Sequence, residues 1–265
     1  MVRSIEHTLD QMGRSFASVI AMLLLLMVSV SAVTYARNPN DSVRVLSYNV
    51  QHCAGSDDSI SIARTAQVIR ATHADVVAVQ ELDSVCTRSG KVSQIHLLAQ
   101  QTGLHGTFAK AIDYQGGAYG IGILSKEEPL SVKRVPLPGQ EPRVLLICEF
   151  RDFVFACTHL DLSESNRLLS LPIILQEASS AGKPFLIAGD LNDEPDSPFI
   201  QQLRSRFLLL NSDFAPTFPA DAPSICIDYV GCYLPGTPVR PVSAKVLNEP
   251  IASDHRPLLC SFLMR

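Results

Sequence analysis

The chain has 265 residues, of which 46% are hydrophobic, and a formal net charge of −4. This length and apolar content suffice for one large α/β domain or two small ones. The acidic balance argues against long nucleic acid as a substrate, because tight non-specific DNA binders usually carry a basic surface, but it does not argue against a small phosphorylated molecule.

The N-terminal part has the layout of a secretory signal. An uncharged apolar run over residues 19–33 follows two arginines and precedes small residues, with Ala32 and Ala36 as candidate cleavage points. The run is short for a membrane-spanning helix, which needs about 20 apolar residues. We therefore expect a signal peptide over residues 1–36, a domain over residues 37–265, and a secreted or periplasmic protein. If the segment stays uncleaved, the protein would be membrane-anchored.

Two predicted strands at the start of the domain end in polar side chains. Residues 43–50 alternate, are rich in β-branched residues and carry Asn49 near their end. Residues 75–81 form a second apolar run, which ends in Glu81. A helix is expected between them, with N-capping side chains at residues 57–59. Taken alone, Glu81 could equally be a surface loop residue.

The next segment predicts a short helix and then a glycine-rich stretch. The helix spans residues 93–103 and stops at Gly103. Residues 114–125 contain four glycines around Tyr119, which indicates turns or close backbone approach. Because no Gly-Lys-Ser follows, a nucleotide-binding P-loop is excluded.

A β-hairpin is predicted in the middle of the chain. Residues 144–150 and 153–158 are apolar runs on either side of a two-residue turn, and the second run leads into His159. A lone histidine after a buried strand is often only structural. A helix over residues 162–182 follows, and Pro172 is expected to bend it.

Residues 185–189 form an apolar run that leads straight into Asp190 and Asn192. Such a run is typical of a fully buried strand. Charge is costly to bury, so a carboxylate at its end must be matched by a cation or by hydrogen-bond donors. Residues 190 and 192 lie on the same face of an extended segment. The alternative is that Asp190 is only a turn or capping residue.

The last part of the chain adds three more polar positions. Asp196 is expected to cap a helix, and a predicted strand over residues 224–230 carries Asp228 in an apolar setting. Asp254 and His255 directly precede the final strand. The order of elements predicts an α/β (α+β) fold with mixed sheets and antiparallel pairs, not a purely parallel sheet.

Polar side chains thus stand at six predicted strand ends: Asn49, Glu81, His159, Asp190 with Asn192, Asp228, and Asp254 with His255. Hard oxygen ligands such as Asn49, Glu81 and Asp254 suit Mg²⁺ or Mn²⁺ better than zinc. The seven cysteines match no paired zinc-binding pattern, although Cys226 and Cys232 could meet across a turn.

These motifs resemble the endonuclease/exonuclease/phosphatase superfamily, which includes secreted deoxyribonuclease, abasic-site endonucleases, bacterial sphingomyelinases and inositol polyphosphate 5-phosphatases. The resemblance spans residues 43 to 262. The motifs that carry it, in chain order, are Leu-Ser-Tyr-Asn49-Val, Val-Gln-Glu81, Tyr119-Gly-Ile-Gly-Ile-Leu-Ser, Thr-His159-Leu, Gly-Asp190-Leu-Asn192, Ile-Asp228-Tyr and Ser-Asp254-His255. Gly-Asp-Leu-Asn and Ser-Asp-His are its most specific parts.

The resemblance implies a deoxyribonuclease-I-like, four-layer sandwich in which two packed mixed β-sheets lie between outer helices. The site would lie at one edge of this sandwich. By resemblance, Glu81 binds the metal, Asn49 and Asp254 lie close to it, and Asp190 orients or deprotonates the attacking water. The expected cofactor is Mg²⁺, with Mn²⁺ as the alternative.

The resemblance also implies roles in phosphate binding. Asn192 and His159 would bind the scissile phosphate, and His255 would contact a phosphate oxygen and stabilise charge in the transition state. Asp228 would be the orienting partner of a histidine. Tyr119 would contact the phosphate or the leaving group. These roles fit phosphoester hydrolysis, which needs a positioned water, a cation and donors to the spreading negative charge.

Some positions depart from the family pattern or are less specific. Gln51 stands where the abasic endonucleases have an acidic residue, which argues against DNA repair, as does the signal segment. Arg88, Arg143 and Lys126 could line the substrate mouth, although each could also be an ordinary surface residue. We take Arg88 and Arg143 as candidate substrate-binding residues.

The leading hypothesis is an exported Mg²⁺-dependent phosphoesterase that hydrolyses a phosphodiester, or a phosphomonoester, of a small or lipid-like substrate. A secreted nuclease is the alternative; nucleic acid is the less favoured substrate. A catalytically dead binding module is disfavoured because no expected site position carries an inert residue. No protein partner is evident, and we expect a monomer.

Overall fold

The computed structural model describes residues 42–264 except 212, 214 and 236–238. All of them belong to one compact unit, Pro39–Arg265. The predicted signal peptide, residues 1–36, lies outside the described residues. Within the described ranges, no helix combines the length and the apolar character needed to cross a membrane.

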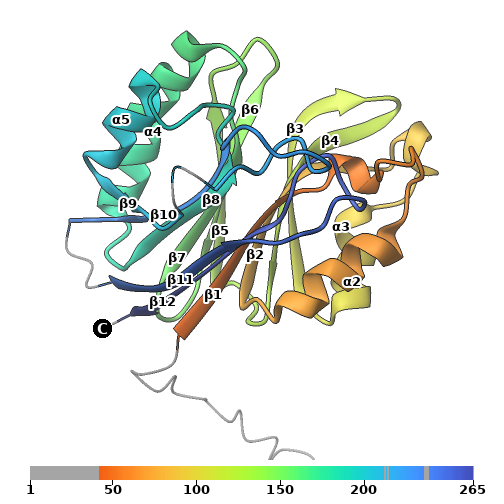
Figure 1. Cartoon of the computed structure of the whole chain (residues 1–265), viewed down its shortest axis with the longest axis horizontal. Coiled ribbons are helices and arrows are strands. Elements are labelled where there is room, and N and C mark those ends of the chain that lie inside the picture. The colour runs from red at the N-terminus through yellow and green to blue at the C-terminus, as the bar shows by residue number, and fades with distance from the viewer. Residues whose placement is uncertain (1–41, 212, 214, 236–238, 265) are drawn as a thin grey trace, which may run out of the picture. The chain divides into compact units, whose positions relative to one another are not determined.

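Two six-stranded mixed sheets form the centre of the fold (Figure 1). The first sheet has the order β11 (Val239–Val246), β12 (Leu258–Met264), β1 (Ser42–Asn49), β2 (Val76–Ser84), β4 (Gly117–Ser125) and β3 (His105–Tyr114). The second has the order β5 (Ser131–Leu137), β6 (Arg143–Glu149), β7 (Val154–His159), β8 (Phe185–Asp190), β10 (Asp228–Tyr233) and β9 (Phe207–Leu209). Each sheet has one parallel pair, β1–β2 and β7–β8, and its other neighbours are antiparallel.

Helices cover the outer face of each sheet, which confirms the predicted four-layer sandwich (Figure 1). α2 (Ile62–Thr72) and α3 (Gln94–Thr102) pack on the first sheet, and α4 (Glu164–Ser180) and α5 (Pro198–Arg204) pack on the second. Between the sheets lies an apolar core that includes Phe155 of β7 and Phe262 of β12. Two short 3₁₀ turns, η1 (Gln51–Cys53) and η2 (Thr87–Ser89), follow β1 and β2.

Local boundaries differ from the expectations at two helix starts. α2 is capped by Ser61, whose Oγ accepts from Arg64 N at 3.3 Å, and not by residues 57–59. α5 is capped by Ser197, not by Asp196. In both cases the capping serine accepts a hydrogen bond from the backbone N–H three residues later, which has no partner within the helix.

Three other expectations on the elements have clear outcomes. The hairpin is confirmed as β6–β7, and the glycine-rich stretch forms the end of the β3–β4 hairpin. β10 begins only at Asp228, so this residue opens a strand and does not lie within one. Cys226 and Cys232 are both free and buried, so they form no disulfide with each other.

Candidate active site

The predicted polar strand ends continue the inward-facing alternation of their strands. In β8, Ala188 belongs to the core between the sheets, and two residues later Asp190 points to the same side. The same alternation directs Asn49 of β1, His159 of β7 and Asp228 of β10 into this space, and all four side chains are buried. The space between the sheets is therefore apolar along most of its length and polar at one end.

Strand pairing in the second sheet brings three of these positions together. His159 pairs with Asp190 in the parallel β7–β8 ladder, and Asp228 pairs with Asp190 in the antiparallel β10–β8 ladder. The β7–β8 contact is close at Gly189, where a Cβ atom would lie 2.0 Å from the carbonyl oxygen of Thr158. Only glycine allows the two backbones to approach this far.

The carboxylate of Asp190 is the centre of the site. Its Oδ2 accepts a 3.0 Å hydrogen bond from Asn49 Nδ2 and lies 3.6 Å from His159 Nε2 and 3.7 Å from His255 Nε2. Its Oδ1 accepts from the backbone N–H of Asn192 at 2.9 Å. Burial raises the pKa of the Asp190 carboxyl, while the neighbouring His159 opposes this shift.

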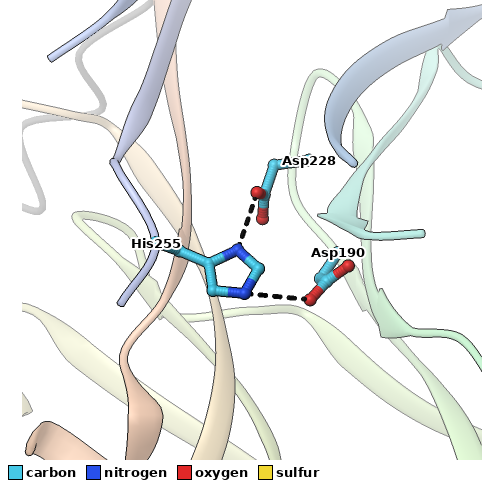
Figure 2. Close-up of side chains that lie close together, drawn as sticks. All are labelled: Asp190, Asp228 and His255. Carbon is cyan, nitrogen blue, oxygen red and sulfur yellow. Dashed lines mark hydrogen bonds and ion pairs between the residues drawn. The ribbon is translucent and has the colours of Figure 1, made fainter. Parts of the chain in front are cut away.

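His255 lies between two carboxylates, with Asp228 on one side of the ring and Asp190 on the other (Figure 2). Its Nδ1 lies 2.9 Å from Asp228 Oδ2 in a buried hydrogen bond. Burial by itself would lower the pKa of His255, but the carboxylate of Asp228, helped by Asp190, raises this pKa to about 10. The ring is therefore an imidazolium at neutral pH, which donates from Nδ1 to Asp228.

His159 is in the opposite protonation state. Burial lowers its pKa to about 4, and the positive charge of Arg143 acts in the same direction, although Asp190 opposes both. At neutral pH the site thus holds one neutral and one cationic imidazole around a single carboxylate. Two histidines with separated pKa values can divide the acceptance and the donation of protons between them.

Glu81 was predicted at a strand end but occupies a β-bulge. β2 runs on to Ser84, and its pairing with β4 shifts register between Val79 and Leu82. Glu81 has a positive φ of 61° at this irregularity. Bulges redirect a side chain relative to the regular pleat. Here the side chain reaches Asn49, whose Nδ2 donates to Glu81 Oε1 at 3.0 Å.

Asp254 completes the acidic side of the site. Burial raises the pKa of its carboxyl and the negative charge of Glu81 adds to this shift, against the effect of His255. Within the described residues, neither Glu81 nor Asp254 forms an ion pair with a lysine or an arginine. Two carboxylates that repel each other without a paired base are a chemically suitable set for a hard divalent cation.

Asn49 links the two halves of the site. Its amide nitrogen donates to both Glu81 and Asp190, and its oxygen accepts from the backbone of Gln51 at 3.1 Å. All of its polar atoms are therefore engaged within the protein. Asn49 thus positions two carboxylates, and the second lone pair of its oxygen remains available to a cation.

Asn192 contacts Oδ1 of Asp190, whereas Asn49 contacts Oδ2. Asn192 has a left-handed backbone conformation with φ of 50°, and its Nδ2 donates to the carbonyl oxygen of Leu160 at 2.9 Å. The second N–H and the oxygen of its amide have no partner among the described residues. A phosphate contact by Asn192, as predicted, would use that second N–H.

Tyr119 and Arg88 lie beside the first sheet's part of the site. Tyr119 pairs with Asp83 across β4 and β2; burial raises the pKa of its hydroxyl, with the charge of Glu81 as the next cause. Arg88 lies over the rings of Tyr114 and Tyr119, at 4.6 and 5.5 Å from their centres. Both carboxylate oxygens of Asp83 accept from Arg88 at 2.8 Å, so the charge of this arginine is largely neutralised.

Arg143 and Lys126 have different outcomes as predicted mouth residues. The Arg143 side chain is only 9% exposed, pairs with Glu141 at 3.0 Å, and leaves its buried Nε without a hydrogen-bond partner. Its effect on the pKa of His159 places its charge next to the site. Lys126 instead pairs with Asp75 at the start of β2, at the other end of the sheet, which agrees with its interpretation as an ordinary surface residue.

Two supporting residues were not predicted. Ser253 Oγ donates to the carbonyl oxygen of Asn49 at 2.8 Å and accepts from the backbone of His255 at 3.3 Å, which ties β1 to the last loop. The ring of Phe218 packs on His255 with 4.8 Å between ring centres. The Ser-Asp-His motif contained a signal for Ser253, whereas nothing in the sequence marked Phe218.

Two donor sets could hold a metal ion. One consists of Asp190, Asp228 and His255, whose ligand atoms lie within 4.8 Å of one another. In that set, however, the imidazole is already hydrogen-bonded to Asp228 and cationic, which disfavours it as a ligand. The other is the unpaired carboxylates of Glu81 and Asp254, whose chemistry fits Mg²⁺ or Mn²⁺ better.

The family model of the Endonuclease/Exonuclease/phosphatase family matches residues 46–255, so the chain belongs to this family. Its members are hydrolytic enzymes that act on phosphoester bonds, and they generally depend on a divalent metal. The matched range includes every predicted site residue. No curated protein matches the sequence significantly.

Solved structures share the fold at low sequence identity. An endonuclease/exonuclease/phosphatase from Beutenbergia cavernae is 20% identical with a TM-score of 0.69, over 84% of this chain and 72% of that one. The mannosyl-6-phosphatase Bt3783 of Bacteroides thetaiotaomicron is 14% identical with a TM-score of 0.69, over 83% and 99%. The human Nocturnin catalytic domain, with a bound sulfate anion, is 18% identical with a TM-score of 0.64, over 84% and 94%.

Proposed function

We propose that the protein is an exported, divalent-metal-dependent phosphoesterase that hydrolyses a phosphodiester of a small or lipid-like molecule. One observation carries the proposal. The buried carboxylate of Asp190 is approached by Asn49, neutral His159 and cationic His255 at 3.0 to 3.7 Å. Asn49 also donates to Glu81, whose charge acts on Asp254, and no lysine or arginine among the described residues pairs with either carboxylate. This arrangement supports a base, a proton donor and a cation site around one point.

The proposed reaction is attack of water on phosphorus. Asp190 orients the water and takes one of its protons, as its raised pKa favours. The water oxygen bonds to phosphorus and one ester P–O bond breaks. The leaving oxygen takes a proton from the His255 imidazolium, and this proton is replaced from Asp190 across their 3.7 Å contact. Atoms and protons then balance, and Asp190 and His255 return to their initial states.

Several residues would bind the phosphate during this reaction. His159 is neutral at neutral pH and can donate one N–H without adding a second cation beside His255. Asn192 offers its second amide N–H, and the unpaired Nε of Arg143 can donate to a phosphate oxygen. Donors held in place before the reaction stabilise developing charge at little reorganisation cost.

In the proposal, Glu81 and Asp254 would hold Mg²⁺ or Mn²⁺, with Asn49 fixing the orientation of Glu81. When bound, the cation would supply charge neutralisation at the phosphate oxygens. The protein's own contribution is the placement of two carboxylates that no basic side chain neutralises among the described residues. Glu81 reaches this place because of the bulge in β2.

A nuclease remains the second candidate, because nucleases belong to the same family. The formal net charge of −4 favours a small substrate over nucleic acid. The proposal of export depends on the apolar segment before residue 34. N-terminal sequencing of the protein recovered from outside the producing cell would test it, with cleavage after residue 32 or 36 as the expected result.

The activity is tested by assaying the purified full chain on bis(p-nitrophenyl) phosphate, p-nitrophenyl phosphate, sphingomyelin and plasmid DNA. Each substrate is tested with Mg²⁺, Mn²⁺ or EDTA. We expect metal-dependent turnover of a diester, loss of turnover in Asp190→Asn and His255→Ala, and normal turnover in Asp152→Asn, which changes an exposed turn residue. Full activity of Asp190→Asn, or activity that EDTA leaves unchanged, would contradict the proposal, and turnover of plasmid DNA alone would favour the nuclease.

A further inference from the structure

A pocket beside the site has apolar walls and acidic rims. It has a volume of about 580 Å³, and Asn192 and His255 form part of its lining. It therefore opens directly onto the groups that would bind phosphate and protonate the leaving oxygen. A ligand bound at His255 would extend into this pocket. The residues that line the pocket therefore indicate which chemical groups the ester substituent carries.

A buried polar group that lacks a hydrogen bond points to a ligand at this place. The side chain of His255 is only 5% exposed. Its Nδ1 is bonded to Asp228, whereas its Nε2 has only the 3.7 Å ion-pair contact with Asp190, which is longer than a hydrogen bond. An imidazole that lines a pocket and has no hydrogen bond at Nε2 is suited to contact an oxygen of the substrate.

The walls of the pocket are apolar. Phe218 packs on His255, and Ile225 and Ile227 continue the same wall. Leu162 borders the pocket with 76% of its surface exposed. An exposed leucine side chain contributes no burial energy to folding. A substituent with apolar atoms that packs on Leu162 would remove this apolar surface from water, which is favourable.

The charge of the pocket is negative. Three carboxylates, of Asp193, Glu194 and Asp196, outnumber the two basic side chains of the lining, Arg167 and His255. Arg167 is buried, bonded to Asp193 at 2.8 Å, and also donates to the carbonyl oxygens of Asp161 and Leu162. Its charge is therefore neutralised within the protein and cannot serve a second phosphate.

Two of the carboxylates remain free to act on a ligand. Glu194 and Asp196 are exposed, and neither forms an ion pair with a residue that the structure describes. Exposed carboxylates near an apolar wall favour a positive group and repel a negative one. A strand of nucleic acid, which has a phosphate at every residue, would place negative charge in this pocket.

We infer that this pocket takes the leaving group of the substrate, and that this group combines apolar atoms with a positive charge, as a substituted ammonium alcohol does. The inference rests on the proposed phosphoesterase activity and names the substrate class of the same site. The leaving group is assigned because His255, the proposed donor of the leaving oxygen's proton, lines the pocket.

The test uses three methyl phosphodiesters that differ only in the second alcohol: choline, its neutral isostere 3,3-dimethylbutanol, and 3-hydroxypropanoate. ³¹P NMR separates methyl phosphate, the product expected when the second alcohol leaves, from the product of methanol loss. We expect kcat/KM for the choline ester to exceed that of the neutral ester by about fivefold, and that of the anionic ester by more, since exposed charge pairs contribute little each.

The rim carboxylates are tested with the double variant Glu194→Gln/Asp196→Asn. It should bring the ratio of kcat/KM for the choline ester to that for the neutral ester close to one. The matched control Asp152→Asn removes an exposed carboxylate in the β6–β7 turn and should keep the full ratio. The variant Glu194→Lys/Asp196→Lys should make the anionic ester the better substrate.

Each other outcome is informative. Equal turnover of the three esters, preference for the anionic ester, or a preference that the double variant keeps would overturn the inference while the phosphoesterase activity stands. Turnover of bis(p-nitrophenyl) phosphate with none of the three esters would also overturn the inference alone. No turnover of any diester with either metal would overturn the proposed function itself, and the inference with it.

Discussion

Asp228 and Asp190 lie directly opposite each other in the antiparallel pairing of β10 with β8, and both are almost fully buried. Two facing carboxylates would repel each other in a site of low polarity. The imidazole of His255 lies between them and is charged, which relieves this repulsion. The charge on His255 is therefore a consequence of strand pairing.

This relationship predicts the effect of Asp228→Asn. The variant keeps the shape of the side chain but removes the charge that raises the pKa of His255, so a proton donor is lost at neutral pH. We expect kcat to fall by roughly 100-fold, with KM changed little, as for the loss of general acid catalysis. Steady-state kinetics with a chromogenic diester measures this. A kcat within twofold of the wild-type value would show that Asp228 does not act through His255.

Metal binding is tested by thermal unfolding, which does not depend on activity. Glu81 and Asp254 repel each other in the protein alone, and this repulsion adds to burial in raising the pKa of Asp254. We therefore expect Asp254→Asn to keep or raise Tm without metal and to lose the rise in Tm that Mg²⁺ produces in the wild type. A ligand at 100 times its Kd stabilises the folded state by about 2.7 kcal/mol.

The control for this experiment is Asp113→Asn, an exposed carboxylate on β3 that pairs only with Lys110. It should show the full increase in Tm with Mg²⁺. An unchanged increase in Asp254→Asn, or no increase in the wild type at any concentration of either metal, would contradict the assigned cation site.

The neutral state of His159 predicts how stability depends on pH. Its pKa is lowered to about 4 in the folded protein, against 6.5 as the ordinary value. Between these values the unfolded chain binds a proton that the folded protein does not, so the free energy of unfolding falls as the pH falls. His159→Gln removes this loss. From pH 7 to pH 4.5 we expect the free energy of unfolding, measured by urea denaturation, to fall by roughly 2 kcal/mol more in the wild type than in the variant. Parallel pH profiles of the two proteins would refute the assignment.

Arg143 and Arg88 should behave differently when their charge is removed. Arg88 is neutralised by Asp83, so Arg88→Met should act mainly on stability. Arg143 has an unpaired Nε and lowers the pKa of His159, so Arg143→Met should reduce kcat/KM, by about 10-fold or more for the loss of one charged donor to phosphate. It should also raise the pKa of His159, which NMR titration of the imidazole measures. Equal effects of both variants on kcat/KM would contradict this difference.

Gly189 is predicted to be required for the pairing that places His159 beside Asp190. A methyl group at this position would lie 2.0 Å from a backbone oxygen of Thr158, which cannot move without opening the ladder. Gly189→Ala should cost about 3 kcal/mol of unfolding free energy. Gly231→Ala is the matched control, because its new methyl meets the mobile end of Leu209 at 3.0 Å. A cost below about 1 kcal/mol for Gly189→Ala would contradict the prediction.

Much of the fold was predictable because local patterns express it. The alternation in residues 43–50 and the apolar run before Asp190 both became strands, and β6–β7 is the hairpin that the two-residue turn indicated. The helix starts were less predictable. Several capping residues stood close together near Ser61 and Ser197, and the choice among them depends on where the helix meets its sheet.

The sequence by itself determined which polar side chains gather at one end of the space between the sheets, because each of Asn49, His159, Asp190 and Asp228 stands at a strand end and continues the inward-facing positions of an apolar strand. It could not show that Glu81 lies on a bulge, that Arg143 remains close to the site while Lys126 lies at the far end, or that Phe218 packs on His255. Only the tertiary structure decided these points. Register, bulges and the separation of charges depend on contacts between segments far apart in the chain, and the protonation of each histidine depends on which carboxylate those contacts bring beside it.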